Sequence, residues 1–291
     1  MNYKNLIYAA VVMSFVSCGA KKEVVKESET SEKERVSRVD DNASKRTPIQ
    51  TETTVKEKKQ KLVFSVKGVA FEMVRVPGGT FTMGATSEQG KFADATEKPA
   101  HKVTLDGYYM GQTEVTQELW NAVMGNNPSK YKGESFPVES VSWDMCQTFL
   151  KRLSVMTGKS FRLPTEAEWE FAARAGKSSG NYMYSGSNNW MDVATRDKYA
   201  TSPTYKVASK KANELGIYDM SGNVSEWCED WYGDYTSASQ TNPKGAQRGE
   251  ARVYRGGSAT MPETYCRVSA RDGGKPESWF YTVGLRLALS E

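Results

Sequence analysis

Histidine is nearly absent from this chain, because His101 is the only one among 291 residues. A histidine-rich zinc site and a two-histidine iron site are therefore excluded within one chain. A Ser-His-Asp triad would have to use His101, but no nucleophile elbow accompanies it. His101 lies between Pro99 and an expected strand at Val103, and we predict a structural role for it.

Cysteine is also scarce, with four residues in the chain. Cys18 lies in the N-terminal segment, which leaves an odd number for the rest of the chain. Cys146 lies on the apolar face of an expected helix and is predicted to be a buried, inert thiol. A Cys228–Cys266 disulfide is compatible with the sequence if the two segments meet in the core. Such a bridge needs Cα atoms about 5.5–6 Å apart.

No apolar run reaches the ~20 residues that a spanning helix needs. Lys4 and the short apolar stretch 6–16 are followed by Val16-Ser-Cys-Gly19, which is typical of a bacterial lipoprotein signal. We therefore expect residues 1–17 to be a signal peptide and Cys18 to be lipidated. An ordinary secretory signal is the alternative. The expected location is the cell envelope, lipid-anchored at the outer membrane, with the membrane face left open.

Residues 18–60 are rich in Lys, Glu, Ser and Thr and contain no aromatic side chain. Such a segment cannot bury enough apolar surface to offset its ordering entropy, so we predict a disordered, charged tether. The whole chain has a formal net charge of +4, with Lys and Glu mixed throughout. This mild balance gives no indication of nucleic-acid binding.

Residues 61–291 are predicted to form one α+β domain. Alternating apolar residues indicate strands at 61–67, 69–76 and 102–110. Helices are expected after three capping residues, with the last in a capping box: Thr116, Ser142 and Thr165. The third of these helices should run to Gly176. Beyond Lys177 the chain is mostly Gly, Ser, Asn and Thr interleaved with aromatics, which predicts long ordered loops.

The segment Gly216–Trp231 joins an oxygen-rich turn to an aromatic cluster. Asp219, Asn223 and Glu226 surround Gly222, where the backbone can turn without a Cβ penalty. Hard cations such as calcium take six to eight oxygen ligands, including carbonyls of a bent backbone. The segment therefore predicts a turn stiffened by a metal ion and packed into the core.

A set of ordered motifs resembles the formylglycine-generating enzyme family, also called the sulfatase-modifying factor domain. Besides the turn, the motifs are Val76-Pro-Gly-Gly-Thr-Phe-Thr-Met-Gly84, Thr113-Glu-Val-Thr116, Pro137-Val-Glu-Ser-Val-Ser-Trp143, Arg162-Leu-Pro-Thr-Glu-Ala-Glu-Trp-Glu170, Arg252-Val-Tyr-Arg-Gly-Gly-Ser258 and Gly284-Leu-Arg-Leu-Ala288. The resemblance covers roughly residues 62–291. It implies a C-type-lectin-like fold with few helices, short strands and long ordered loops.

The resemblance also implies a calcium site in the turn. It maps the ligands onto the side chains of Asp219 and Glu226 and the carbonyls of Gly222 and Val224. We expect calcium to be bound, although Asp219 and Glu226 could instead be ordinary surface acids or partners of arginine. The family's second calcium site has no clear ligand set in this chain.

Members of the family with oxidase activity convert a sulfatase cysteine to formylglycine, using copper(I) held by two cysteines after the Arg-Gly-Gly-Ser motif. Counting forward from that motif puts Met261 at the first position and Cys266 at the second. Counting back from Arg267 indicates a short deletion, and Cys266 then matches neither position. A Met261–Cys266 site and a Cys228–Cys266 site are the remaining options for copper. Since the thiolate pair is missing in both registers, we do not expect copper to bind.

Several arginines on the terminal strands are expected to pair with buried carboxylates. The arginines are Arg252, Arg255, Arg267, Arg271 and Arg286, and the carboxylates are Glu166, Glu168 and Glu226.

Two functions compete on these grounds, and carbohydrate binding is a weaker third. The first is a membrane-anchored, non-catalytic binding or scaffold protein with an envelope protein or peptide as partner, by analogy with Bacteroidetes-type lipoproteins. The second is an oxidase that generates formylglycine with an altered copper site, for which Cys266 would be obligatory. Loss of the thiol pair favours the first.

Overall fold

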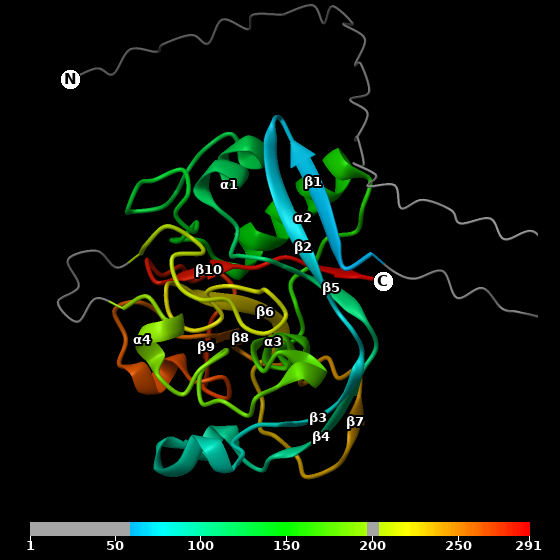
Figure 1. The fold of residues 1–291 in the computed structure, drawn as a ribbon. Helices are drawn as coiled ribbons and strands as arrows, with labels where there is room; N and C mark the ends of the chain where they lie inside the picture. Colours follow the sequence, from blue (N-terminus) through cyan, green and yellow to red (C-terminus); the bar gives the residue numbers. More distant parts are fainter. Residues whose placement is uncertain (1–58, 197–203) are drawn as a thin grey trace, which may run out of the picture.

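The computed structural model describes residues 59–196 and 204–291, which fold around three small sheets (Figure 1). The expected signal peptide, Cys18 and nearly all of the expected tether lie outside these residues. Short strands, few helices and long loops confirm the predicted α+β class.

Each sheet brings together strands from distant parts of the chain. The first sheet is antiparallel throughout, in the order β1 (Lys61–Val66), β2 (Val69–Val76), β5 (Tyr108–Gly111) and β11 (Ala288–Ser290). The second has the order β10 (Val283–Leu285), β6 (Ser225–Trp231), β8 (Arg252–Arg255) and β9 (Arg271–Gly274). The third has the order β3 (Gly79–Met83), β4 (His101–Leu105) and β7 (Gln240–Thr241).

Three helices begin where the capping residues predict: α1 (Gln117–Met124), α2 (Trp143–Thr157) and α3 (Glu166–Ala173). In each case the hydroxyl of the preceding Thr or Ser accepts a hydrogen bond from a backbone N–H of the first turn. The prediction that the third helix reaches Gly176 is wrong. The chain leaves the helix after Ala173 because Ala175 takes a left-handed conformation, with φ of 62°. A short helix, α4 (Trp190–Val193), lies in the loop region.

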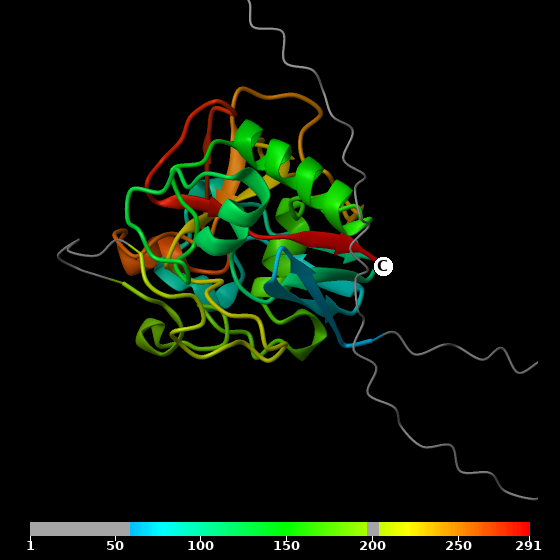
Figure 2. The same ribbon diagram turned by 90° about the horizontal axis from the view of Figure 1, so that it is seen from above.

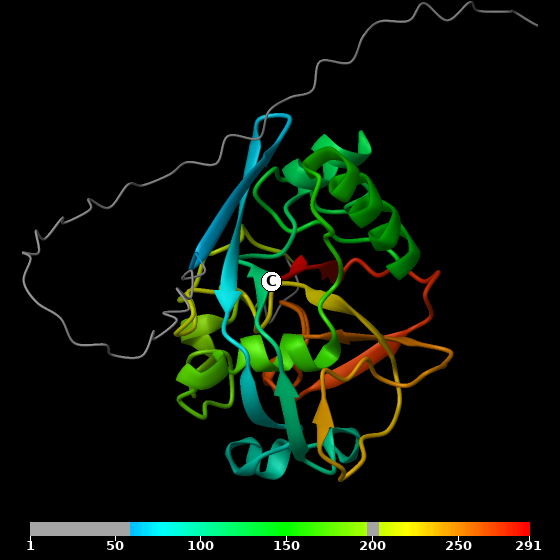
Figure 3. The same cartoon turned by 90° about the vertical axis from the view of Figure 1, so that its right-hand side faces the viewer.

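The helices cover different parts of the core. Helices α1 and α2 pack together and against β1 and β2, whereas α3 contacts β3, β6 and β8. Figure 3 shows α2 and the β1–β2 hairpin at one end of the molecule, with the second sheet beyond them, and Figure 2 looks down on that end. Trp120 of α1 stacks on Phe149 of α2 in the core. Within residues 59–196 and 204–291, no helix has the length and apolar character to cross a membrane.

Candidate functional site

The turn before β6 is tied to the segment after β8. Asp219, Gly222 and Asn223 all have positive φ, so the backbone reverses sharply. Gly222 is required, because a Cβ there would lie 2.7 Å from the carbonyl oxygen of Thr195. The N–H of Gly222 donates to the carbonyl of Gly256 at 2.9 Å. The oxygen-rich turn and the Arg-Gly-Gly-Ser motif therefore form one site.

Glu226 is buried and its carboxylate is fully engaged. Arg286 donates to both oxygens, at 2.6 Å from Nη2 to Oε1 and 2.9 Å from Nε to Oε2. The indole N–H of Trp169 donates to Oε2 at 2.7 Å. Glu226 thus uses its oxygens for a bidentate arginine pair, which was the alternative to calcium ligation at this residue.

Asp219, by contrast, has an unsatisfied oxygen. Its Oδ2 accepts from the N–H of Ala208 at 2.6 Å, whereas Oδ1 is buried without a hydrogen-bond partner among the described residues. Burial raises the pKa of Asp219, against the lowering effect of the hydrogen bond from Ala208. The charge of Arg286 and the neighbouring carboxyl of Glu114 also lower this pKa. A buried carboxylate of this kind is costly unless a proton or cation compensates it.

A second buried acid, Glu114, interacts with Asp219 and was not among the residues predicted for this site. A proton or cation that compensates Asp219 would therefore also affect Glu114. Glu114 is 2% exposed, and both of its carboxyl oxygens lack a partner in the described part of the chain. Burial and then the charge of Asp219 raise the pKa of Glu114 well above its usual value. Glu114 also lines a cavity of about 280 Å³, together with Thr113 and Thr116. One signal was available: Glu114 lies within the Thr113–Thr116 motif that carries the family resemblance.

Glu114, Asp219 and Glu226 place three carboxyl groups around the single guanidinium of Arg286. No three His, Cys, Asp or Glu side chains of the described residues converge as a metal site, so calcium would need backbone carbonyls besides these carboxyl groups. The oxygens still available belong to Glu114 and Asp219, not to Glu226. Of the two side chains that the resemblance implies as calcium ligands, Asp219 therefore has a free oxygen and Glu226 does not. Glu114 is an additional candidate ligand, whereas Glu226 would affect the site only through its pairing with Arg286.

The segment after the Arg-Gly-Gly-Ser motif contains one buried thiol. Cys266 packs against Tyr184 and Val193 and is fully buried. Burial raises the pKa of this thiol to about 12, so it is protonated at neutral pH. Met261 is partly exposed and donates its N–H to the carbonyl of Ser258 at 3.1 Å. The hollow beside Met261 has a volume of only about 10 Å³, room for about one water molecule.

Cys228 and Cys266 are both free thiols, so the Cys228–Cys266 disulfide is not formed. The condition for this bridge, that the two segments meet in the core, is not met because the two residues belong to different core clusters. Cys228 lies on β6 and packs with Val253 and Met220, away from the cluster of Cys266. Cys146 is a buried thiol with a raised pKa, as predicted.

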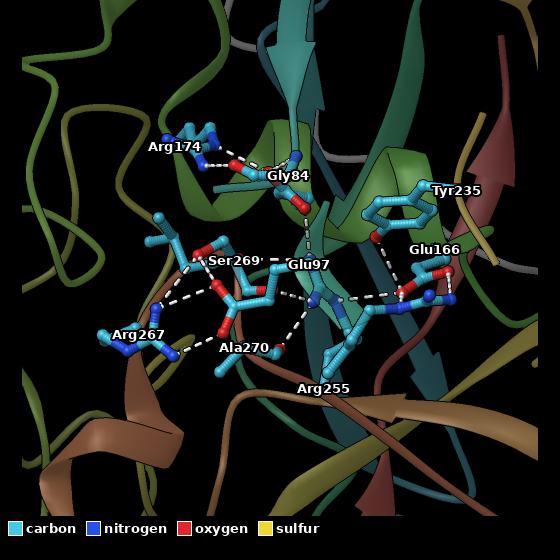
Figure 4. Close-up of polar contacts among 12 residues, drawn as sticks. Gly84, Glu97, Glu166, Arg174, Tyr235, Arg255, Arg267, Ser269 and Ala270 are labelled. Atoms are coloured by element: carbon cyan, nitrogen blue, oxygen red, sulfur yellow. Dashed lines mark hydrogen bonds and ion pairs between the residues drawn. The ribbon is translucent and has the colours of Figure 1, made fainter. Parts of the chain in front are cut away.

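The second sheet and α3 are joined by buried arginine–carboxylate pairs, part of which Figure 4 shows. Arg255 pairs with Glu170 and donates to the carbonyls of Val268, Ser269 and Ala270. The other pairs on the predicted arginines are Arg267–Glu97, Arg271–Glu166 and Arg286–Glu226.

Two details of the predicted pairing are wrong. Glu168 pairs with Arg162, because both lie at the capping box of α3. Arg252 pairs with no carboxylate among the described residues. Its guanidinium lies instead between the rings of Trp143 and Trp231, 3.9 and 3.5 Å from their centroids.

Residues 59–291 match the model of the sulfatase-modifying factor enzyme 1-like domain. The chain belongs to this family. It is 34% identical over 298 residues to a formylglycine-generating enzyme of Thermomonospora curvata, covering 77% of this chain and 95% of the relative. It is 36% identical over 214 residues to the chaperone protein LppX of Paenibacillus barcinonensis, covering 56% and 73%. Among solved structures, the Treponema denticola variable protein 1 has a TM-score of 0.73 and 32% identity, covering 80% and 100%.

The sulfatase-modifying factor domain of this chain does not fit the copper site that the resemblance implies. Such a site needs two soft thiolates, and the cluster around Cys266 contains a single, protonated thiol. Met261 supplies a thioether, which cannot deprotonate. The glycine and serine of the motif are preserved in sequence, but the donor set for copper is incomplete.

Proposed function

We propose that this protein is a non-catalytic binding or scaffold protein of the cell envelope, anchored by a lipid on Cys18. One observation carries the proposal: where the resemblance implies a pair of copper-binding cysteines, this chain has a single buried thiol, Cys266, whose pKa is raised to about 12. A protonated thiol in an apolar cluster is a poor ligand and a poor nucleophile. The family fold remains as a rigid scaffold with long ordered loops, which suits recognition of a protein or peptide.

The competing function is formylglycine generation, which the similarity to the Thermomonospora curvata enzyme favours. We expect no conversion when the protein is incubated under air with copper(I) and a Cys-x-Pro-x-Arg peptide, because the thiolate pair is absent. The mass of the peptide is the readout, and the Thermomonospora curvata enzyme is the positive control. Conversion of the cysteine to the aldehyde, with loss of conversion in Cys266→Ser, would identify the protein as an oxidase.

The proposed anchor has its own test. Cys18→Ser is expected to move the protein from the membrane fraction to the soluble fraction and to abolish incorporation of a palmitate label. The reason is that a single lipidated cysteine supplies the acyl chains that hold such a protein on a membrane. Cys146→Ser changes a buried thiol at a distant site and serves as the matched control. Membrane attachment that persists in Cys18→Ser would exclude the anchor.

We also propose that calcium stiffens the turn, held by Asp219 and Glu114 with the carbonyls of Gly222 and Val224. The unsatisfied buried oxygens of Asp219 and Glu114 support this proposal. When bound, calcium would neutralise the two carboxylates and fix the turn against the Arg-Gly-Gly-Ser segment. Its role would be structural, since no substrate group needs activation in a binding protein.

A further inference from the structure

A second polar cavity lies near the third sheet, apart from the turn and the Cys266 segment. It has a volume of about 380 Å³, and its lining includes His101, Glu166, Asp230, Tyr235 and Arg271. From the sequence, His101, Glu166 and Arg271 are predicted to be structural, and Asp230 and Tyr235 have no predicted role. One acid of the cavity, Asp230, forms no ion pair with the described residues.

Glu166 and Arg271 neutralise each other. Arg271 donates from Nε and Nη2 to the two oxygens of Glu166, each at 2.7 Å. Its remaining terminal nitrogen donates to the carbonyls of Gly233 and Thr96. The hydroxyl of Tyr235 donates to Glu166 at 3.1 Å (Figure 4). Four of the five N–H donors of Arg271 are used in these contacts, and none of the contacts involves the other acid of the cavity.

Asp230 is that acid, and it is 3% exposed. Its Oδ2 accepts from the N–H of Glu166 at 2.9 Å, and this carboxyl forms no ion pair among residues 59–196 and 204–291. The charge of Arg252 reaches Asp230 only at longer range. Burial and then the charge of Glu166 raise the pKa of Asp230 well above its usual value. The backbone of Gly245 packs directly against this side chain, because a Cβ at Gly245 would lie 2.8 Å from Oδ1.

His101 supplies a second acceptor. Its Nδ1 lies 3.1 Å from the carbonyl oxygen of Pro99, which can only accept, so Nδ1 carries the proton in the neutral ring. Nε2 is then an acceptor without a partner among the described residues. The ring packs edge-on against Tyr235, with centroids 5.0 Å apart. Trp231 adds another aromatic side chain to the lining.

A cavity with a buried carboxyl outside any ion pair, an imidazole nitrogen that can accept a hydrogen bond and aromatic walls is complementary to a cation with N–H donors. The aromatic walls favour an organic cation over a metal ion. We propose that this cavity binds an ammonium or guanidinium group, carried by a basic side chain of a partner or by a free amine. Asp230 would be the counterion, and His101 an additional acceptor.

The single histidine makes the test direct, because His101 gives the only imidazole signals in the NMR spectrum of the full-length protein. We expect n-butylammonium and methylguanidinium to shift these signals saturably, and n-butanol and butyrate to leave them unchanged. Asp230→Asn keeps an acceptor for the N–H of Glu166 and is expected to weaken cation binding by about tenfold or more. Asp144→Asn removes the same charge from an exposed position on α2 and should bind as the wild type does.

Two further ligands distinguish the source of the cation. Tighter binding of an acetylated Gly-Lys-Gly amide than of n-butylammonium, with no binding of its norleucine analogue, would assign the site to a basic side chain. Equal binding of the peptide and n-butylammonium would assign it to free amines. The absence of a saturable shift with every cation would overturn the proposal, as would unchanged binding in a folded Asp230→Asn variant. If Asp230→Asn does not fold, the wild-type comparison of cations with n-butanol and butyrate still decides the matter.

Discussion

Replacing Arg255 with methionine is expected to lower the free energy of unfolding by about 3–5 kcal/mol, the usual cost of removing one partner from a buried ion pair. Arg255 is 1% exposed and joins α3 to the segment after β8. Its loss would leave the buried carboxylate of Glu170 without one of its two arginines, the other being Arg174. It would also leave three carbonyls without their donor. Urea unfolding followed by tryptophan fluorescence measures the change.

Lys61→Met provides the comparison for Arg255→Met. Lys61 pairs with Glu72 at the surface, where both side chains are well exposed, and such pairs contribute at most about 1 kcal/mol. A loss in Arg255→Met as small as that in Lys61→Met would show that the arginine network does not hold α3 to the second sheet.

Glu114→Gln is expected to have the opposite effect in the absence of calcium. Because the folded state raises the pKa of Glu114, this state retains a proton that the unfolded chain releases above its ordinary pKa of about 4.3. The contribution of Glu114 to stability therefore falls as the pH rises from that value towards the folded pKa. Removing the acid should stabilise the protein in EGTA at pH 7, and the gain should grow with pH by up to about 1.4 kcal/mol per unit.

Calcium should reverse the order of stability of the wild type and Glu114→Gln. The wild type is expected to gain about 2.7 kcal/mol at a calcium concentration of 100 times Kd, whereas Glu114→Gln should gain much less. Glu118→Gln, on the exposed side of α1, is the matched control and should behave as the wild type in both conditions. Thermal unfolding with calcium and with EGTA gives both comparisons. A wild type that does not respond to calcium, or a Glu114→Gln variant that responds fully, would exclude Glu114 as a calcium ligand.

The parts of the fold that depend on neighbouring residues were predictable from the sequence. The caps at Thr116, Ser142 and Thr165 act within one helical turn, so their helices begin where the motifs place them. The end of α3 was misplaced because the left-handed residue is Ala175, and alanine carries no signal for that conformation.

Within the site, only the contacts that follow from the chemical type of the side chains were predictable from the sequence. The pairing of Arg286 with Glu226 follows from the need to neutralise buried charge. The role of Glu114 depends on the approach of Asp219 from 105 positions along the chain, which no local pattern reports. The separation of Cys228 from Cys266 likewise depends on the core cluster into which each residue packs, and no local pattern shows this.

The placement of β10 and β11 determines when this domain can fold during synthesis. Strand β11 pairs with β5, and β10 pairs with β6, so residues 283–290 complete two separate sheets. A nascent chain that has not yet emerged from the ribosome to this point would leave the edges of β5 and β6 unpaired. Unpaired edges invite association with other chains. Until β10 and β11 have emerged, β5 and β6 must therefore be shielded from neighbouring polypeptides if the domain is to fold without association.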